Sequence, residues 1–155
     1  RVIVWGFLGM GINAAMIIFS KGTPILMEYL GMTDAITSFT NTDFTLNKLW
    51  VALAVSIAMN TIFAPVFMTF HKITDIHIAE TGGTLKGFFS KALPMQEIMA
   101  NKINWNVQYG FIFKKTIPLF WYPAHTITFL LPGNFQVLFA AMLGVVLGLI
   151  LTIKK

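Results

Sequence analysis

The sequence predicts an all-α protein, an integral membrane bundle of four transmembrane helices with amphipathic segments at the membrane interface. Two observations support this fold class. The chain of 155 residues is 56% hydrophobic and only 11% charged, whereas soluble domains are roughly 45–50% apolar and about 25% charged. Its apolar residues also gather in four long blocks that contain no Lys, Arg, Asp or Glu. The length suits one domain, so we expect residues 1–155 to form a single transmembrane domain.

The first block covers residues 2–19. At about 1.5 Å per residue it would span roughly 27 Å, close to the hydrocarbon thickness of a bilayer. It lacks a basic leader and a small-x-small cleavage site, so we expect a retained span and no cleavable signal peptide. The Lys-Gly-Thr-Pro sequence at 21–24 follows this block, and residues 25–30 are expected to form a short, separate helix at the interface.

The second block covers residues 49–70 and contains Pro65. We interpret Pro65, together with Pro118 and Pro123 further along the chain, as fixed kinks that let short spans tilt and pack. Hinges that open a pore are the alternative interpretation. The long connection after this block contains an amphipathic segment at 85–99 that is broken at Pro94 and is expected to lie on the membrane surface.

The third block covers residues 116–131 and is extended backwards by an aromatic, amphipathic stretch at 105–113. The fourth block covers residues 135–153. The Pro-Gly-Asn sequence at 132–134 predicts a tight turn between them. The third and fourth blocks should therefore form an antiparallel helical hairpin.

Small residues recur in the fourth block at Ala140, Gly144 and Gly148. A spacing of four residues places them on one face of a helix. Small residues let helix backbones approach closely in membranes, so we expect this face to pack against another helix. Ordinary composition is the alternative, because glycine is common in transmembrane helices.

Charge predicts the orientation, because basic residues favour the cytoplasmic side of a membrane. With four spans, the side that holds the two termini and the connection at 71–115 receives nine basic residues, and the opposite side receives Lys21 and Lys48. We therefore expect a multi-pass membrane protein with both termini on the cytoplasmic or matrix side. The nine are Arg1, Lys72, Lys86, Lys91, Lys102, Lys114, Lys115, Lys154 and Lys155.

Several functional classes are not supported by the sequence. The net charge of +5 is distributed between apolar blocks, so it predicts topology and no nucleic-acid partner. Disulfides and thiolate metal sites are excluded because the chain has no cysteine. No span contains an acidic residue, and there is neither a Gly-x-Ser-x-Gly motif nor a phosphate-binding Gly-rich loop. We therefore expect no enzyme and no cofactor.

The histidines His71 and His77 flank Asp75. A metal site or pH sensor is one interpretation of this cluster. A spacing of six residues does not place both histidines on one helical face, however. We therefore expect a solvated interfacial pair without a metal, and a local ion pair between Lys72 and Asp75.

Three polar side chains lie inside the predicted spans: Asn13, Asn60 and His125. Each lies near the middle of its block, so all three would sit at a similar depth. A polar group in hydrocarbon needs a partner, and these side chains should therefore point into the bundle. They are candidates to line an aqueous path. The alternative is that they hydrogen-bond between helices and have only a structural role.

The leading functional hypothesis is a channel or transporter-like pore for small solutes. The alternative is a non-catalytic structural subunit or scaffold of a larger membrane protein complex. Membrane lipids are the expected partners in both cases, together with copies of this chain or partner membrane subunits. A pore requires polar groups of several spans to converge, whereas a subunit requires an apolar outer face that matches its partner.

Two stretches resemble a known family. In the first, Pro65 is followed ten residues later by Asp75, with the aromatic pair Phe70 and His71 between them. The second contains Trp121, Pro123, Pro132 and Gln136. Residues 60–155 thereby resemble the Mpv-seventeen/peroxisomal membrane protein family, in which a second helix ends in Gly-Pro, an aromatic pair and Asp, and aromatic-proline motifs occur near the C-terminus.

The resemblance implies a small four-helix protein of peroxisomal or inner mitochondrial membranes, a family for which channel activity has been proposed. Without it, the cell membrane is the expected location. The chain departs from the family pattern at Ala64, where the family has Gly, and at Gln136, where it has Arg. Any gating role of that Arg therefore does not carry over to this chain.

Overall fold

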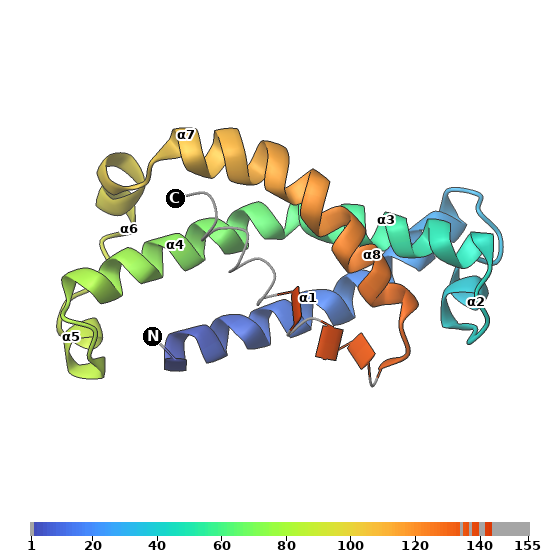
Figure 1. Cartoon of the computed structure of the whole chain (residues 1–155), viewed down its shortest axis with the longest axis horizontal. Coiled ribbons are helices and arrows are strands. Elements are labelled where there is room, and N and C mark those ends of the chain that lie inside the picture. The colour runs from blue at the N-terminus through green and yellow to red at the C-terminus, as the bar shows by residue number, and fades with distance from the viewer. Residues whose placement is uncertain (1, 134, 137, 140–141, 144–155) are drawn as a thin grey trace.

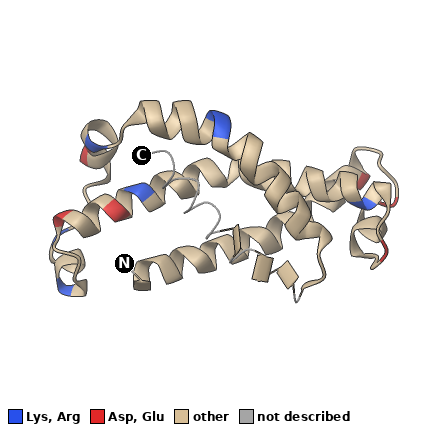
Figure 2. Ribbon diagram, in the orientation of Figure 1, with Lys and Arg blue, Asp and Glu red and all other residues tan. Residues whose placement is uncertain are grey.

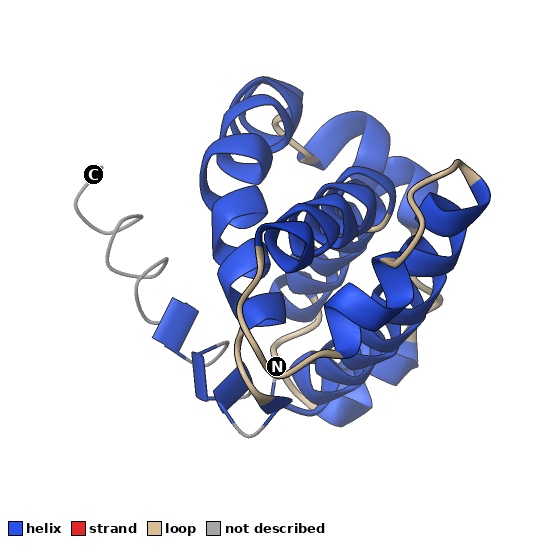
Figure 3. Ribbon diagram, turned by 90° about the vertical axis from the view of Figure 1, so that its right-hand side faces the viewer, coloured by secondary structure: helices blue, strands red, loops and turns tan. Residues whose placement is uncertain are grey.

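The computed structural model describes residues 2–133, 135–136, 138–139 and 142–143. Throughout this part of the chain the regular secondary structure is helical and no strand occurs (Figure 3). The all-α prediction is therefore confirmed. The bundle is elongated, and each long helical segment runs roughly antiparallel to the one before it in the chain (Figure 1).

Helix α1 (Val2–Tyr29) is a single helix of 28 residues, which corresponds to a length of about 42 Å. The predicted separate helix at 25–30 is wrong, because α1 continues through Pro24. Proline removes only one helical hydrogen bond, and Thr23 and Pro24 are buried in the bundle, where packing supports the helix. The chain leaves α1 at Gly31, whose φ of 102° is a conformation that glycine adopts readily.

The second block forms two helices. After the short helix α2 (Ala35–Thr40), helix α3 (Leu46–Ile62) is followed by α4 (Ala64–Glu80), and the two are bent by 44°. The predicted bend at Pro65 is confirmed, because Pro65 lies at the start of α4, where its missing N–H costs no helical hydrogen bond. The helix also extends beyond the predicted end at residue 70, because His71, Lys72 and their neighbours continue α4.

The connection after α4 contains α5 (Leu85–Ser90), α6 (Met95–Glu97) and a π-helical turn, η1 (Ile98–Lys102). Residues 91–94 separate α5 from α6, so the predicted break at Pro94 is confirmed. Consecutive left-handed residues, Gly82 (φ 76°) and Gly83 (φ 72°), turn the chain between α4 and α5.

The third block and the stretch before it form one continuous helical segment, as predicted. It consists of α7 (Trp105–Val107), the π-helix η2 (Gln108–Trp121) and α8 (Tyr122–Leu130). Asn104 caps its start, because its Oδ1 accepts hydrogen bonds from the backbone N–H groups of Asn106 and Val107. The wider π-helical winding accommodates Pro118 inside the segment.

The main core lies between α3 and α8, which form the most extensive helix–helix contact among the described elements. Val51, Ala52, Val55 and Met59 of α3 are buried there against Phe129 of α8. Helix α1 packs on α3 beside this core. The packing thereby fixes how the polar side chains of α3 and α8 lie relative to each other.

The predicted turn after α8 is present: the chain leaves α8 at Leu131, and the Phe135 N–H donates to the Pro132 carbonyl (2.8 Å). Most of the fourth block, including Ala140, Gly144 and Gly148, lies outside the described residues. Its packing therefore stays a prediction.

Among the described helices, α1 alone is long and apolar enough to cross a membrane by itself. The bent pair α3–α4 passes the same test together, so up to two spans meet the criteria of length and composition. Figure 2 shows that charged residues gather mainly toward the two ends of the elongated bundle.

Candidate functional site

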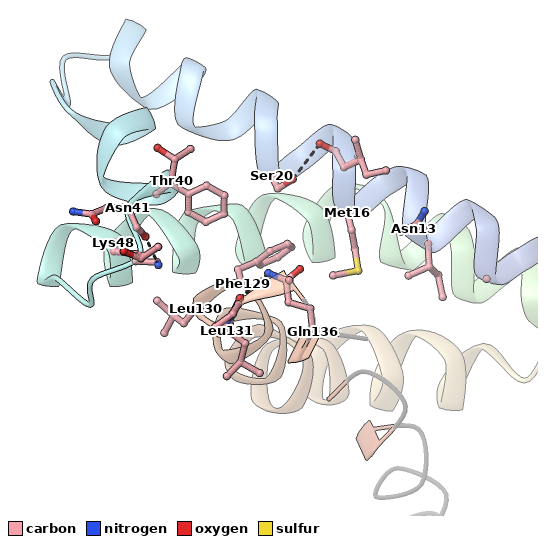
Figure 4. Close-up of a pocket in the computed structure, with 17 residues that line it drawn as sticks. Asn13, Met16, Ser20, Thr40, Asn41, Lys48, Phe129, Leu130, Leu131 and Gln136 are labelled. Carbon is pink, nitrogen blue, oxygen red and sulfur yellow. Dashed lines mark hydrogen bonds between the residues drawn. The ribbon is translucent and has the colours of Figure 1, made fainter. Parts of the chain in front are cut away.

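A partly open cavity of about 610 Å³ lies between α1, the α2–α3 connection and the end of α8 (Figure 4). Its volume is typical of small-molecule sites, which measure roughly 300–1,000 Å³. Apolar side chains form much of its wall, including Ile12, Met16, Phe39 and Phe129. Its polar lining residues are Asn13, Ser20, Thr40, Asn41, Thr42, Lys48 and Gln136.

Lys48 is the only charged residue among the described residues that line this cavity. Its side chain is buried, with 8% of the residue exposed, and its Nζ donates a hydrogen bond to the Asn41 carbonyl (2.6 Å). No carboxylate of the described chain forms an ion pair with it. A buried ammonium group normally has a carboxylate partner, so Lys48 is an unusual feature of this bundle.

Local structure holds Lys48 in place. Thr45 is the N-cap of α3, and its Oγ1 accepts a hydrogen bond from the Lys48 backbone N–H (3.1 Å). Lys48 therefore lies in the first turn of α3, where the helix dipole is positive and disfavours a cation. Both burial and position on the helix thus oppose a lysine here.

The other polar groups are spaced along the cavity (Figure 4). Lys48, Asn41 and Thr40 lie at one end and Asn13 at the other, with Ser20 of α1 between them. Gln136 lies on the opposite wall, where its Nε2 donates to the Leu131 carbonyl (2.9 Å). Asn13 is exposed, and its side chain has no hydrogen bond within the described chain. The cavity thus offers polar groups at intervals along an otherwise apolar wall.

Asn60 and His125 lie elsewhere, at the contact between α3 and α8. The Asn60 Nδ2 is 2.9 Å from the His125 Nδ1, and the Asn60 Oδ1 is 3.1 Å from the same atom, so the tautomer of His125 decides which bond forms. The Asn60 Nδ2 also donates to the Ser56 carbonyl (2.8 Å), and the Ser56 Oγ donates to the Tyr122 carbonyl (2.8 Å). The structure thus joins these side chains in one interhelical network.

The expected convergence of three mid-span groups is met only in part. Asn60 and His125 point toward each other, as expected, but neither lines the cavity. Asn13 lines the cavity, and within the described part of the chain its side chain forms no hydrogen bond with that pair. The reason is packing: α8 covers the Asn60 face of α3, whereas Asn13 faces the space beside the end of α8.

His71 and His77 have different surroundings. The His71 Nδ1 lies 3.6 Å from the Asp75 Oδ2, and the Trp5 Nε1 donates to the Asp75 Oδ1 (3.1 Å). Asp75 is therefore paired with α1 and with His71, and the predicted ion pair with Lys72 is wrong.

The prediction that His77 is solvated is also wrong. It is buried, and its Nε2 lies 3.0 Å from the Phe88 carbonyl, because α5 folds back onto α4. No group of three or more His, Cys, Asp or Glu side chains in the described part of the chain could hold a metal ion.

The residues of the family resemblance fall in two places. Pro65, Phe70, His71 and Asp75 lie on α4, where Phe70 is partly exposed. Trp121 lies directly before α8. The centroid of its ring is 5.0 Å from that of Phe120 and 5.1 Å from that of His125.

The remaining motif residues lie on or beside α8. Pro123 is in the first turn of α8. Pro132 and Gln136 line the cavity. The second motif therefore borders the candidate site. The first motif lies on α4, which does not line the cavity.

Lys48, Thr40 and Asn41 were not predicted as site residues. In the sequence, Lys48 has the position of an ordinary lysine at the edge of an apolar block. The one available signal was that it lies on the side that receives only two basic residues. Its burial depends on the α2–α3 connection, which folds over it.

Comparison of the chain with protein-family models, curated proteins and solved structures found no match. The site is therefore interpreted from its own geometry.

Proposed function

We propose that this chain is a multi-pass integral membrane protein that forms a pore for small polar solutes, with the Lys48 cavity as one mouth of the pore. The observation that carries the proposal is the cavity itself. Polar side chains from α1, from the α2–α3 connection and from the segment after α8 border one space at intervals from Lys48 to Asn13. Such spacing would offer a solute successive hydrogen-bonding partners.

The surface of α1 supports a membrane environment. Only 6% of its most apolar window is buried inside the bundle. Large apolar side chains are therefore exposed on a helix that is long enough to cross a bilayer. They are Val2, Ile3, Trp5, Phe7, Met10, Ile17, Ile18, Ile25 and Leu26.

The sequence between the charges supports four spans. Residues 2–20, 49–71 and 116–153 contain no Lys, Arg, Asp or Glu. In this proposal the charge-free parts of α1, of the α3–α4 pair and of the η2–α8 segment are the first three spans, and residues 135–153 are the fourth. Both termini face the cytoplasm or the matrix. Single cysteines at positions 41 and 86 test this topology, because the chain has no other cysteine. Labelling from the same side would contradict it.

We also propose the distant relation to the Mpv-seventeen/peroxisomal membrane protein family. Its second motif, with Pro132 and Gln136, borders the cavity, which agrees with a role in transport. An inner mitochondrial or peroxisomal location follows from the relation, and the cell membrane is the alternative location.

A second candidate function is that of a structural subunit in a larger membrane complex. The exposed apolar face of α1 favours it, because a partner helix would cover such a face as well as lipid does. In that case the cavity would have no through path, and liposomes containing the protein would not release solutes.

The experiment that tests the pore is solute efflux from liposomes that contain the full chain. Gly9 lines the cavity, and a Cβ on it would meet no atom within 4 Å. Gly9→Trp should therefore place an indole in the cavity without straining the backbone. We expect it to slow efflux by about tenfold or more, which corresponds to about 1.4 kcal/mol.

Gly6→Trp is the matched control. Gly6 is on the same helix, also has no atom within 4 Å of an added Cβ, and does not line the cavity. It should leave efflux unchanged. Equal efflux from Gly9→Trp and Gly6→Trp, or no efflux from wild type above empty liposomes, would contradict the pore.

A further inference from the structure

The charge of the cavity suggests what it binds. We propose that Lys48 binds the anionic group of the ligand, a carboxylate or a phosphate, and that the pore therefore favours small anions. The selectivity part of this inference rests on the proposed function, whereas the binding part does not.

The first argument is the charge inventory. The described lining of the cavity contains one cation, Lys48, and no Asp or Glu. A wall with a single positive charge attracts anions and repels cations. Phosphate and carboxylate ligands form strong, charge-assisted hydrogen bonds with an ammonium group that has no carboxylate partner of its own.

The second argument is the energetic position of Lys48. It is buried, it lies at the positive end of the α3 dipole, and no acidic side chain of the described residues compensates it. Each of these features costs stability when no counter-charge is bound. A bound anion would remove the uncompensated charge and would be stabilised by the same dipole.

The third argument is the number of free donors. An ammonium group has three N–H donors, and the Asn41 carbonyl is the one acceptor that the Lys48 Nζ meets in the described chain. The Asn41 side-chain oxygen accepts a hydrogen bond from the Asp43 N–H (3.2 Å), which leaves the Asn41 Nδ2 as a donor. Figure 4 shows both side chains at the same end of the cavity. The Lys48 ammonium group thus keeps two N–H donors for one anionic group.

The anionic group can come from a soluble molecule or from a lipid headgroup. The experiment separates these sources with the purified full chain in an uncharged maltoside detergent. Thermal unfolding is followed with inorganic phosphate or succinate against chloride at equal ionic strength, and in a second arm with phosphatidylglycerol against phosphatidylcholine in the micelles. Stabilisation by the first pair identifies a soluble anion, and stabilisation only in the second arm identifies a lipid.

The variants are Lys48→Met, Lys48→Arg and the control Lys21→Met. Lys21 is exposed and does not line the cavity. We expect Lys48→Met to weaken anion binding roughly tenfold or more, as expected for the loss of a hydrogen bond to a charged group. Lys48→Arg keeps the charge and should retain binding, and Lys21→Met should bind like wild type. Circular dichroism verifies that each variant is helical.

The proposal is overturned if phosphate, succinate and phosphatidylglycerol all fail to stabilise the wild type. It is also overturned if Lys48→Met is stabilised as much as Lys21→Met. Anion binding that depends on Lys48 without any efflux would support the site and contradict the pore. Efflux with equal rates for anions and cations would leave the pore standing and overturn the anion preference.

Discussion

Two polar clusters are buried in this bundle, and they differ in whether the protein satisfies them. At the α3–α8 contact, Asn60 is 1% exposed and bonds to Ser56 and His125. At the cavity, Lys48 is almost as buried but has one backbone carbonyl as its partner in the described chain. A satisfied polar group holds two helices together, whereas a buried cation with no acidic partner calls for another explanation, and an anionic ligand is one.

The comparison changes the interpretation of the mid-span residues. The sequence makes Asn60 and His125 candidates to line a path, a role in which Asn60→Leu would alter flux without affecting folding. Their network inside the α3–α8 contact favours the structural alternative. Asn13, the third candidate, is the one that borders the cavity.

The largest effect is expected for Asn60→Leu. The substitution removes the hydrogen bonds to Ser56 and His125 and leaves buried acceptors unpaired. We expect it to lower the free energy of unfolding by about 2–3 kcal/mol, measured by denaturant titration in detergent micelles. Asn13→Leu is the control and should change stability little, because the Asn13 side chain is exposed and makes no hydrogen bond within the described chain. If Asn60→Leu and Asn13→Leu lowered the free energy of unfolding equally, the Asn60 cluster would not have the structural role that distinguishes it from the cavity.

Lys48→Met is expected to change stability in the opposite direction. It replaces a buried, uncompensated cation with an apolar side chain of similar length. We expect the free energy of unfolding to rise by about 1 kcal/mol in the absence of an anion, measured by the same titration. A clear loss of stability would show that Lys48 supports the fold and would contradict its assignment as a ligand-binding group.

The smallest effect is expected for Lys102→Met. In contrast to Lys48, Lys102 has acidic partners. The Lys102 Nζ lies 2.8 Å from Glu80 and 3.0 Å from Glu97 at the surface. Hydrogen bonds to Glu80 and then Glu97 raise the pKa of Lys102 above its ordinary value.

The stabilisation of the fold by the Lys102 ion pairs is therefore fully present below the ordinary lysine pKa. It is lost as the pH rises through the raised pKa of Lys102. We expect only a small fall in melting temperature at neutral pH, because exposed ion pairs contribute little. Wild type and Lys102→Met should converge in thermal scans above the raised pKa. A large difference at neutral pH, or one that persists at alkaline pH, would contradict this.

The sequence predicted the helical class, the bend at Pro65, the break at Pro94 and the continuous segment through α7, η2 and α8. Each of these features depends on local rules of helix formation. The sequence did not predict that α1 continues past Pro24, because buried neighbours support the helix there.

The site was less predictable, since it depends on long-range packing. Asn60 and His125 are 65 positions apart, and nothing local says that they touch. Lys48 becomes a site residue only because the α2–α3 connection and the end of α8 come together around it. The position of a residue within an apolar block predicts its depth in a span, and it does not predict which side chains surround it.

The ion preference of the proposed pore tests the central claim most directly, because it depends on both the proposed membrane path and the charge of Lys48. The measurement is the reversal potential across a planar bilayer that contains the full chain, under a salt gradient, for wild type and Lys48→Met. We predict a reversal potential on the anion-selective side for wild type and one shifted toward zero for Lys48→Met. Identical reversal potentials for the two proteins would contradict the account.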